Sequence, residues 1–292
     1  MKKYFVLMRV HQYIKNFLIF FPIFFSLNLL NWGKLEIVLI SFLSFCLMCS
    51  SVYIINDIID VEKDKLHPVK KNRPIASGII SLSRAKQLAV LLFLVSIILL
   101  YVVDGVKVTM LYLLMYFILN IAYSFKLKNI PILDIAILSF GFVIRLLFGA
   151  AIIGVSVSNW LYLTILSISF YLVLGKRRNE LRNQGGKSRK VLLKYSFEFL
   201  DKNMYFCLTL GVIFYCLWCI DPFIIKNYPK LVYSIPIILL ICLRYNFNIE
   251  SSSFGDPVDV VLKDKVLLTM ILIYGIIMFI LFYGSMIKGF FI

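Results

Sequence analysis

The sequence feature that most constrains the fold is a series of apolar segments long enough to cross a lipid bilayer. Runs such as FLIFFPIFFSLNLL and AVLLFLVSIILLYVV recur along the 292 residues, and the mean hydropathy is +0.92. A bilayer span needs about 20 apolar residues in sequence, more than the core of a soluble domain requires. We therefore predict an all-α, multi-pass membrane protein. Its nine expected spans are 14–31, 36–56, 86–103, 108–124, 132–154, 158–175, 204–221, 231–246 and 267–290.

The N-terminal segment MKKYFVLMRVHQYIKNF is expected to be an uncleaved first helix. Its basic opening is similar to that of a signal peptide, but Arg9, His11 and Lys15 interrupt the apolar region, and no small-residue cleavage site follows. The six cysteines all fall in or at the edge of apolar spans. Although two pairs have C-x-x-C spacing, zinc sites need polar supporting loops, so we expect packing roles for these thiols.

The basic residues predict the orientation of the chain in the membrane. Odd-numbered loops and the C-terminus hold few of the 31 Lys and Arg residues, namely Lys34, Lys107, Lys226, Lys230 and Lys288. Because cytoplasmic loops carry the basic excess, we expect a cytoplasmic N-terminus and an external C-terminus, in the cell (plasma) membrane. The net charge of +16 then reflects orientation and attraction to anionic lipids, and no nucleic-acid partner is expected.

The whole chain, 1–292, is expected to form one membrane domain whose catalytic loops face the cytoplasm. These loops are approximately 57–85, 125–131, 176–203 and 247–266. Orientation alone does not explain them, because they also contain carboxylates: Asp57, Asp60, Glu62, Asp64, Glu180, Asp256, Asp259 and Asp264. Charge at the edge of an apolar span is costly unless it has a partner or a function.

The segment NDIIDVEKDKLHPVKKNRPIASG, residues 56–78, holds the strongest candidate site. If the second span continues as a helix, Asp57, Asp60 and Asp64 lie on one face, with Asn56 one turn before Asp60. Clustered oxygen ligands beside water favour Mg²⁺, which also binds phosphate oxygens. The basic residues that follow, Lys70 and Arg73, suit phosphate groups. The alternative is a solvated helix end whose carboxylates pair with nearby lysines.

A second group of polar residues surrounds the start of the fifth span. Tyr123, Lys126 and Lys128 precede Asp134, and Arg145 follows inside an apolar segment. An unpaired guanidinium at that depth is costly, and Asp134 is three turns away, so we expect Arg145 to meet another helix or an anionic ligand. A purely structural buried pair is the alternative. After the sixth span, Lys176 and Arg177 suit a terminal phosphate. The alternative is that they only reflect the basic excess of a cytoplasmic loop.

These motifs resemble those of the UbiA-type intramembrane prenyltransferase superfamily. The resemblance covers essentially the whole chain and rests on N-D-x-x-D-x-x-x-D followed by R-P-I-A-x-G. It implies nine transmembrane helices around a central cavity with a polar cytoplasmic cap. The aromatic prenyltransferases of the superfamily carry a second D-x-x-x-D motif. Here Asp134 is present, but Leu138 stands four residues on.

That departure directs the resemblance to one branch of the superfamily, the polyprenyl-phosphate phosphoribosyltransferases. HQYIKN, DxxxDxxHPxKxxRPIAxG, AYSFKLK, GKRRNEL and GDPVDVVLKDK are the segments that resemble this branch. The resemblance implies an enzyme that transfers 5-phosphoribose from 5-phosphoribose 1-diphosphate to a polyprenyl phosphate and releases pyrophosphate. The product would be a precursor of cell-envelope glycans.

The resemblance also implies roles for individual residues. Asp57, Asp60 and Asp64, supported by Asn56, would hold Mg²⁺ on the leaving diphosphate. Lys126, Lys128 and Tyr123 would bind or orient the diphosphate, with Lys70 and Arg73 beside it. Lys176 and Arg177 would take the 5-phosphate, and Lys15 with Asn16 the phosphate of the lipid. His11 as a general base is not required, because a phosphate monoester is already largely ionised near neutral pH.

Two other functions are open at this point. The first is transfer of a prenyl group from its diphosphate to an aromatic or other acceptor, with the same aspartates. The second is a transporter or lipid-binding scaffold that binds anions without chemistry, although transporters usually show paired repeats and residues 56–78 have no counterpart in the second half. The length of the polyprenol and the oligomeric state are not predicted.

Overall fold

The computed structural model describes residues 2–184, 190–251 and 256–290, and it divides into two compact units. Unit 1 is Met1–Ser156 and unit 2 is Val157–Ile292. The described residues contain helices and no strands, which confirms the all-α class. Residues 185–189 and 252–255 of the predicted loops 176–203 and 247–266 lie outside the described residues.

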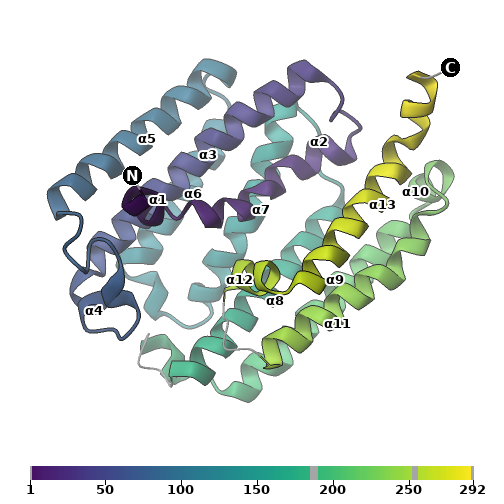
Figure 1. Cartoon of the computed structure of the whole chain (residues 1–292). Helices are drawn as coiled ribbons and strands as arrows, with labels where there is room; N and C mark the ends of the chain where they lie inside the picture. Colours follow the sequence, from purple (N-terminus) through teal and green to yellow (C-terminus); the bar gives the residue numbers. More distant parts are fainter. Residues whose placement is uncertain (1, 185–189, 252–255, 291–292) are drawn as a thin grey trace. The chain divides into compact units, whose positions relative to one another are not determined.

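Unit 1 contains seven α-helices and three 3-10 helices (Figure 1). In chain order they are α1 Lys2–Met8, η1 Val10–Phe20, α2 Phe21–Phe25, α3 Trp32–Ile59, α4 Val61–Lys65, η2 Lys70–Asn72, α5 Leu82–Asp104, α6 Val108–Phe125, η3 Leu127–Asn129 and α7 Leu133–Ile153.

The helix α3 is the central element of unit 1, and it packs against α5, α6, α7 and η1. Small hydroxyl side chains let α5 approach α3 closely. Ser44 donates to the Ser96 carbonyl and Ser96 donates to the Ser44 carbonyl, both at 2.7 Å, and Ser51 donates to Ala89. Reciprocal hydrogen bonds between small residues are typical of helices that associate inside a bilayer, where apolar burial gives little driving force. The rest of the interior is aromatic and aliphatic.

Unit 2 contains the remaining helices of the described chain (Figure 1). They are α8 Asn159–Gln184, η4 Lys190–Lys194, α9 Phe197–Cys219, α10 Pro222–Asn227, η5 Leu231–Ser234, α11 Ile235–Ser251, α12 Pro257–Lys263 and α13 Lys265–Phe290. The pair α8 and α9 forms the main packing contact, and α11 packs against α13. Within unit 2, the hydroxyls of Tyr274, Tyr215 and Ser234 form a chain of hydrogen bonds.

Seven helical segments of the described chain are long and apolar enough to span a membrane. They are 32–59, 82–104, 108–125, 133–153, 197–219, 231–250 and 265–284. On α5, Val90, Leu91, Leu94 and Ile98 lie on one face and are each at least half exposed, which a lipid environment accommodates. The chain is thus a multi-pass membrane protein. Expected span 158–175 lies in α8, which is not among the seven, so the count of nine is not confirmed.

The expected first span, 14–31, is wrong as a continuous α-helix. Residues 10–20 form a 3-10 helix, α2 follows for five residues, and turns replace helix after Phe25. Pro22 supplies the physical reason, because it has no N–H with which to bond Leu18, as an α-helix through it would need. In the 3-10 arrangement Phe21 donates to the Leu18 carbonyl instead. Arg9, just before η1, has a left-handed backbone with φ of 52°.

Candidate active site

The three aspartates of residues 56–78 lie where α3 ends and α4 begins. Asp57 is in the last turn of α3, Asp60 is the residue between the two helices, and Asp64 is in α4. The helix therefore continues past residue 56 as expected, but it stops at Ile59, and Asp64 belongs to a second helix. Asp57 and Asp64 are 3% and 4% exposed. Carboxylates at a helix C-terminus face the partial negative charge of the last carbonyls, so they need nearby cations.

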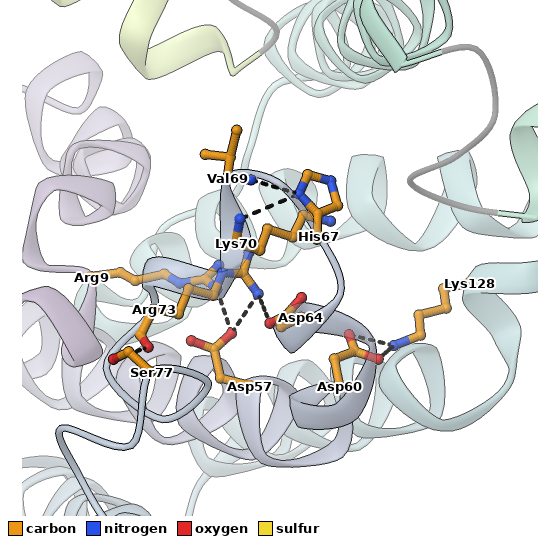
Figure 2. A network of polar contacts seen from close by, with 10 residues as sticks. All are labelled: Arg9, Asp57, Asp60, Asp64, His67, Val69, Lys70, Arg73, Ser77 and Lys128. Carbon is orange, nitrogen blue, oxygen red and sulfur yellow. Dashed lines mark hydrogen bonds and ion pairs between the residues drawn. The ribbon is translucent and has the colours of Figure 1, made fainter.

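Arginine supplies these cations to Asp57 and Asp64. One nitrogen of Arg73, Nη1, donates to Asp57 Oδ1 at 3.0 Å and to Asp64 Oδ2 at 2.6 Å (Figure 2). Arg9 Nη2 donates to the same Asp57 Oδ1 at 2.5 Å. The Arg9 guanidinium also lies over the ring of Tyr53, with its central carbon 5.1 Å from the ring centroid. Two guanidinium groups from separate segments thus converge on one carboxylate oxygen.

Asp60 has a different partner. Lys128, in η3, donates from Nζ to Asp60 Oδ1 at 2.6 Å and to Oδ2 at 2.7 Å. Figure 2 shows this pair beside the arginine group rather than within it. The Lys128 residue is 9% exposed, so the pair is largely screened from water. The two regions singled out in the sequence, 56–78 and 123–134, therefore meet in unit 1 through this ion pair.

The turn that carries Arg73 is fixed by local hydrogen bonds. His67 Nδ1 accepts from the backbone N–H groups of Val69 and Lys70, so the proton of its neutral ring is on Nε2 (Figure 2). Ser77 donates to the Arg73 carbonyl at 2.8 Å. Gly78 has φ of +77°, a conformation that glycine adopts without strain. Together these bonds hold the Arg73 side chain over the aspartates.

Arg145 lies in the interior of unit 1 and bonds to neutral acceptors. Its Nε donates to Asn16 Oδ1 at 2.6 Å, Nη1 to the Gly141 carbonyl at 2.6 Å, and Nη2 to the Tyr116 hydroxyl at 3.2 Å. The Cys49 sulfur is 3.7 Å from Nη2. Rings of Phe45, Tyr116 and Phe142 also face its guanidinium. Arg145 therefore contacts another helix, η1, which was one of the two expected partners. Its positive charge is stabilised by neutral dipoles and by the faces of aromatic rings.

The other predicted residues of unit 1 differ in their burial. Asn56 is half-buried in α3 and Tyr123 is buried at the end of α6. Asp134 is fully buried in the first turn of α7. Lys126 is exposed, and Lys15 and Lys70 are half-buried. Asn16 is buried; its Oδ1 accepts from Arg145, and its Nδ2 donates to the Cys46 sulfur at 3.1 Å.

The polar residues of unit 2 form carboxylate–cation pairs of their own. Lys176 Nζ lies 3.0 Å from Asp256 Oδ2, and Asp256 also caps α12 by accepting from Val258 N. Arg177 is fully buried and donates to Glu180 at 2.8 Å. The expected phosphate ligands Lys176 and Arg177 thus lie near the end of α8, each beside a carboxylate.

A further pair precedes α13. Arg244 Nε donates to Asp264 Oδ2 at 2.7 Å, and the Asn248 amide donates to the same oxygen. Backbone N–H groups of Val266 and Leu267 donate to Asp264 Oδ1, so this carboxylate caps α13. The Arg244 hydrogen bond, followed by those of Asn248 and the backbone, holds the pKa of Asp264 well below its usual range. Asp264 thus caps and orients the last helix.

Sequence reasoning missed Arg9 as part of this site. It counted Arg9 only as a polar interruption of the first segment. The signal available was its place between Met8 and HQYIKN, close to a motif that carries the resemblance. Its contact with Asp57 spans 48 residues of sequence and depends on a left-handed turn, which no local pattern predicts.

Comparison with known proteins identifies the family. The model of the UbiA prenyltransferase family matches residues 17–253. The chain belongs to the UbiA prenyltransferase family. It is 32% identical over 268 residues to a decaprenyl-phosphate phosphoribosyltransferase of Corynebacterium glutamicum, covering 89% of this chain and 80% of that relative. A protein of the same name from Mycolicibacterium smegmatis is 33% identical over 240 residues, covering 78% and 74%.

Solved structures of the UbiA fold agree with this assignment. A UbiA homolog from Archaeoglobus fulgidus bound to DMAPP and Mg²⁺ has a TM-score of 0.69 at 18% identity, covering 94% of this chain and 98% of that chain. The same homolog bound to GPP and Mg²⁺ has a TM-score of 0.69 at 19% identity, covering 94% and 99%. At these identities the likeness shows the fold alone.

The donor groups at the end of α3 fit a divalent cation in chemistry. They are carboxylate oxygens from two consecutive helices, the ligand type that Mg²⁺ prefers. In the part of the chain that the structure describes, no three His, Cys, Asp or Glu side chains converge closely enough to hold an ion. The aspartates are instead engaged by Arg9, Arg73 and Lys128, which have the opposite charge that a diphosphate would attract.

Proposed function

We propose that this UbiA-family transferase moves 5-phosphoribose from 5-phosphoribose 1-diphosphate to a membrane polyprenyl phosphate, with release of pyrophosphate. The observation that carries the proposal is the identity of 31–33% to proteins named decaprenyl-phosphate phosphoribosyltransferase, over 78–89% of this chain. The paired acidic and basic side chains of unit 1 support it, because a diphosphate and its cation need ligands of both signs. The product would enter cell-envelope glycan synthesis.

Within this reaction, an oxygen of the lipid phosphate attacks C1 of the ribose and the bond from C1 to the diphosphate oxygen breaks. The electron pair of that bond leaves with the diphosphate, so the developing charge is negative. Arg73, Arg9 and Lys128 are the cations that stabilise it. Mg²⁺, when bound to Asp57, Asp60 and Asp64, supplies further neutralisation of the diphosphate. An in-line displacement inverts the configuration at C1.

The remaining substrate contacts follow the sequence predictions. We assign the lipid phosphate to Lys15, and Asn16 holds the segment that carries Lys15 in place through its bond to Arg145. Lys126 and Lys70 assist the diphosphate. For the 5-phosphate we propose Lys176 in preference to Arg177, because the Arg177 side chain is fully buried and pairs with Glu180. The active site is proposed to face the cytoplasm, where the water-soluble donor is found, and the polyprenyl chain to lie among apolar helices in the plasma membrane.

The test is product formation by the full-length protein in nanodiscs. Radiolabelled 5-phosphoribose 1-diphosphate is supplied with a polyprenyl phosphate, with Mg²⁺ or EDTA, and label in the lipid phase is counted. We expect Mg²⁺-dependent label that falls by about 100-fold or more in Asp60→Asn, the effect of removing a group that acts on transition-state charge. The matched control is Glu62→Gln, an exposed carboxylate two residues away that pairs with Lys65. Its activity should equal that of the wild type.

One observation favours a second function, prenyl transfer from a prenyl diphosphate to another acceptor. The solved structures of the same fold hold DMAPP or GPP with Mg²⁺. Absence of lipid-phase label with every polyprenyl phosphate, together with turnover of a prenyl diphosphate and an aromatic acceptor, would replace the first proposal by this one. Both functions release pyrophosphate, so only the labelled product separates them.

A further inference from the structure

The position of Arg73 has a consequence for how a metal ion binds. A single nitrogen of its guanidinium contacts Asp57 of α3 and Asp64 of α4, at 3.0 and 2.6 Å. A divalent cation shared by two aspartates contacts oxygens from both side chains in the same way. The guanidinium nitrogen thus occupies the place between the carboxylates that a bridging ion requires. Ion and guanidinium cannot both be there.

The charges of the cluster cancel before any ligand arrives. Asp57, Asp60 and Asp64 carry three negative charges, and their partners Arg9, Arg73 and Lys128 carry three positive ones. A bare divalent cation therefore gains no net attraction from these six groups. It would also have to displace the Arg73 guanidinium from Asp57 and Asp64, and so break two ion pairs with largely buried carboxylates.

The backbone of Arg9 has a strained conformation in this arrangement. Its φ of 52° lies in the left-handed region, which residues other than glycine adopt only when the surrounding structure holds them there. In that conformation the side chain reaches Asp57 and lies over Tyr53. Leu27 and Ile132 also have positive φ, of 59° and 68°, so this backbone strain is not confined to the cluster. Of the three residues, Arg9 is the one whose side chain bonds to Asp57, and strained residues in such positions are typical of functional sites.

We propose that Arg73 and Arg9 are internal counter-ions that occupy the metal position until a diphosphate arrives, so that metal and diphosphate bind together. This inference rests on the metal site of the proposed function. A diphosphate offers oxygens that accept both guanidinium groups, and Asp57 and Asp64 are then released to the ion. Because coupling of two ligands is reciprocal, the diphosphate strengthens metal binding by the same factor as the metal strengthens diphosphate binding.

The test measures binding, not turnover. Full-length protein in nanodiscs of neutral phosphatidylcholine is titrated with Mn²⁺, and the free ion is followed by electron paramagnetic resonance. We expect the wild type to bind Mn²⁺ alone weakly, and Arg73→Gln to bind it about 10- to 100-fold more tightly, the usual range of such coupling. Arg9→Gln should gain in the same direction. It serves as the second variant if Arg73→Gln does not fold, which thermal unfolding reports.

Three variants control for other causes of tighter binding. Lys65→Gln removes a positive charge from an exposed pair in the same segment and should leave the Mn²⁺ affinity unchanged. Arg73→Lys keeps the charge and should bind Mn²⁺ weakly, like the wild type. Asp64→Asn in the Arg73→Gln background should abolish the gain, which places the ion at the aspartates.

A second readout uses the common product of both candidate reactions. Labelled inorganic pyrophosphate should be retained by wild-type nanodiscs with Mn²⁺ and lost when EDTA is added. Equal Mn²⁺ affinity of wild type and Arg73→Gln, or an equal gain in Lys65→Gln, would overturn the inference. Neither outcome depends on phosphoribosyl transfer. Failure of the lipid-labelling assay with the expected Mn²⁺ results would therefore reject only the proposed function.

Discussion

The close approach of η1 to Gly149 of α7 gives a sharp prediction about the position of the N-terminal segment. A Cβ added at Gly149 would stand 2.2 Å from the carbonyl oxygen of Ile19 and 2.9 Å from its carbonyl carbon. Ordinary van der Waals contact begins near 3.4 Å. Gly149→Ala therefore requires the two backbones to separate by about 1 Å. No side-chain rotation relieves the clash, because both Ile19 atoms belong to the backbone.

The size of the effect follows from two opposing contributions. Forcing a methyl group into a packed interior costs about 1–3 kcal/mol, and replacing glycine by alanine inside a helix returns up to about 1 kcal/mol. Because the 2.2 Å contact is with backbone, the cost lies in the upper part of its range. We expect a net loss of about 1–2 kcal/mol, which lowers the melting temperature by several degrees. Activity should fall further than stability alone requires. The segment that moves carries Asn16, which bonds Arg145, and begins next to Arg9, which contacts Asp57.

The assay follows unfolding of purified protein in detergent with a thiol-reactive fluorophore. Cys46 and Cys49 are free and buried in unit 1, so they react only when it opens. The four free thiols of unit 2, three of them half-buried, are replaced by serine in every protein compared. The matched control is Gly275→Ala in α13, where an added Cβ meets no atom within 4 Å. The control should be as stable as the wild type or slightly more so. Equal melting temperatures and equal activities for Gly149→Ala and Gly275→Ala would refute the close approach.

Three further predictions concern ion pairs and buried hydrogen bonds. Lys128→Met should abolish transfer in the lipid-labelling assay, and Lys128→Arg, which keeps the charge on Asp60, should retain part of it. Arg145→Lys should lower the melting temperature, because a lysine cannot bond Asn16, Gly141 and Tyr116 together, and each such bond contributes about 1.5–3 kcal/mol. Arg244 depresses the pKa of Asp264, so this pair stabilises the fold above about pH 4 and loses that contribution at lower pH. The melting temperatures of wild type and Arg244→Gln should therefore converge as the pH falls below about 4.

Hydropathy predicted most of the helices because length and composition are enough for an uninterrupted span. The expected spans 86–103, 108–124 and 132–154 differ from α5, α6 and α7 by only a few residues at each end. The first span failed because its hydropathy is that of a helix while its backbone is not. Pro22 removes the α-helical hydrogen bond to Leu18, a local effect that an average over side-chain polarity does not detect.

The candidate site was predicted where its members are neighbours in sequence and missed where they are not. Asp57, Asp60, Asp64 and Arg73 share one segment, so their charges and spacing could be interpreted together. The contact of Lys128 with Asp60 was not specified, although both residues were singled out. Arg9 was beyond reach, since its contribution depends on one left-handed residue that turns a guanidinium toward Asp57.

The role of Arg145 was predicted in part. Its sequence position predicted either another element or an anionic ligand, since a buried guanidinium needs acceptors for its N–H groups. The structure satisfies those groups with an amide, a carbonyl and a hydroxyl, and three aromatic rings face the remaining charge. The amide is that of Asn16 in η1, so Arg145 holds η1 in place. The same segment packs closely against α7 because Gly149 has no side chain. A direct role of Arg145 in substrate binding stays a prediction. Its contacts give it a positioning role, because it holds the 3-10 helix that follows Arg9. Arg145 thereby helps to keep the Arg9 guanidinium beside Asp57.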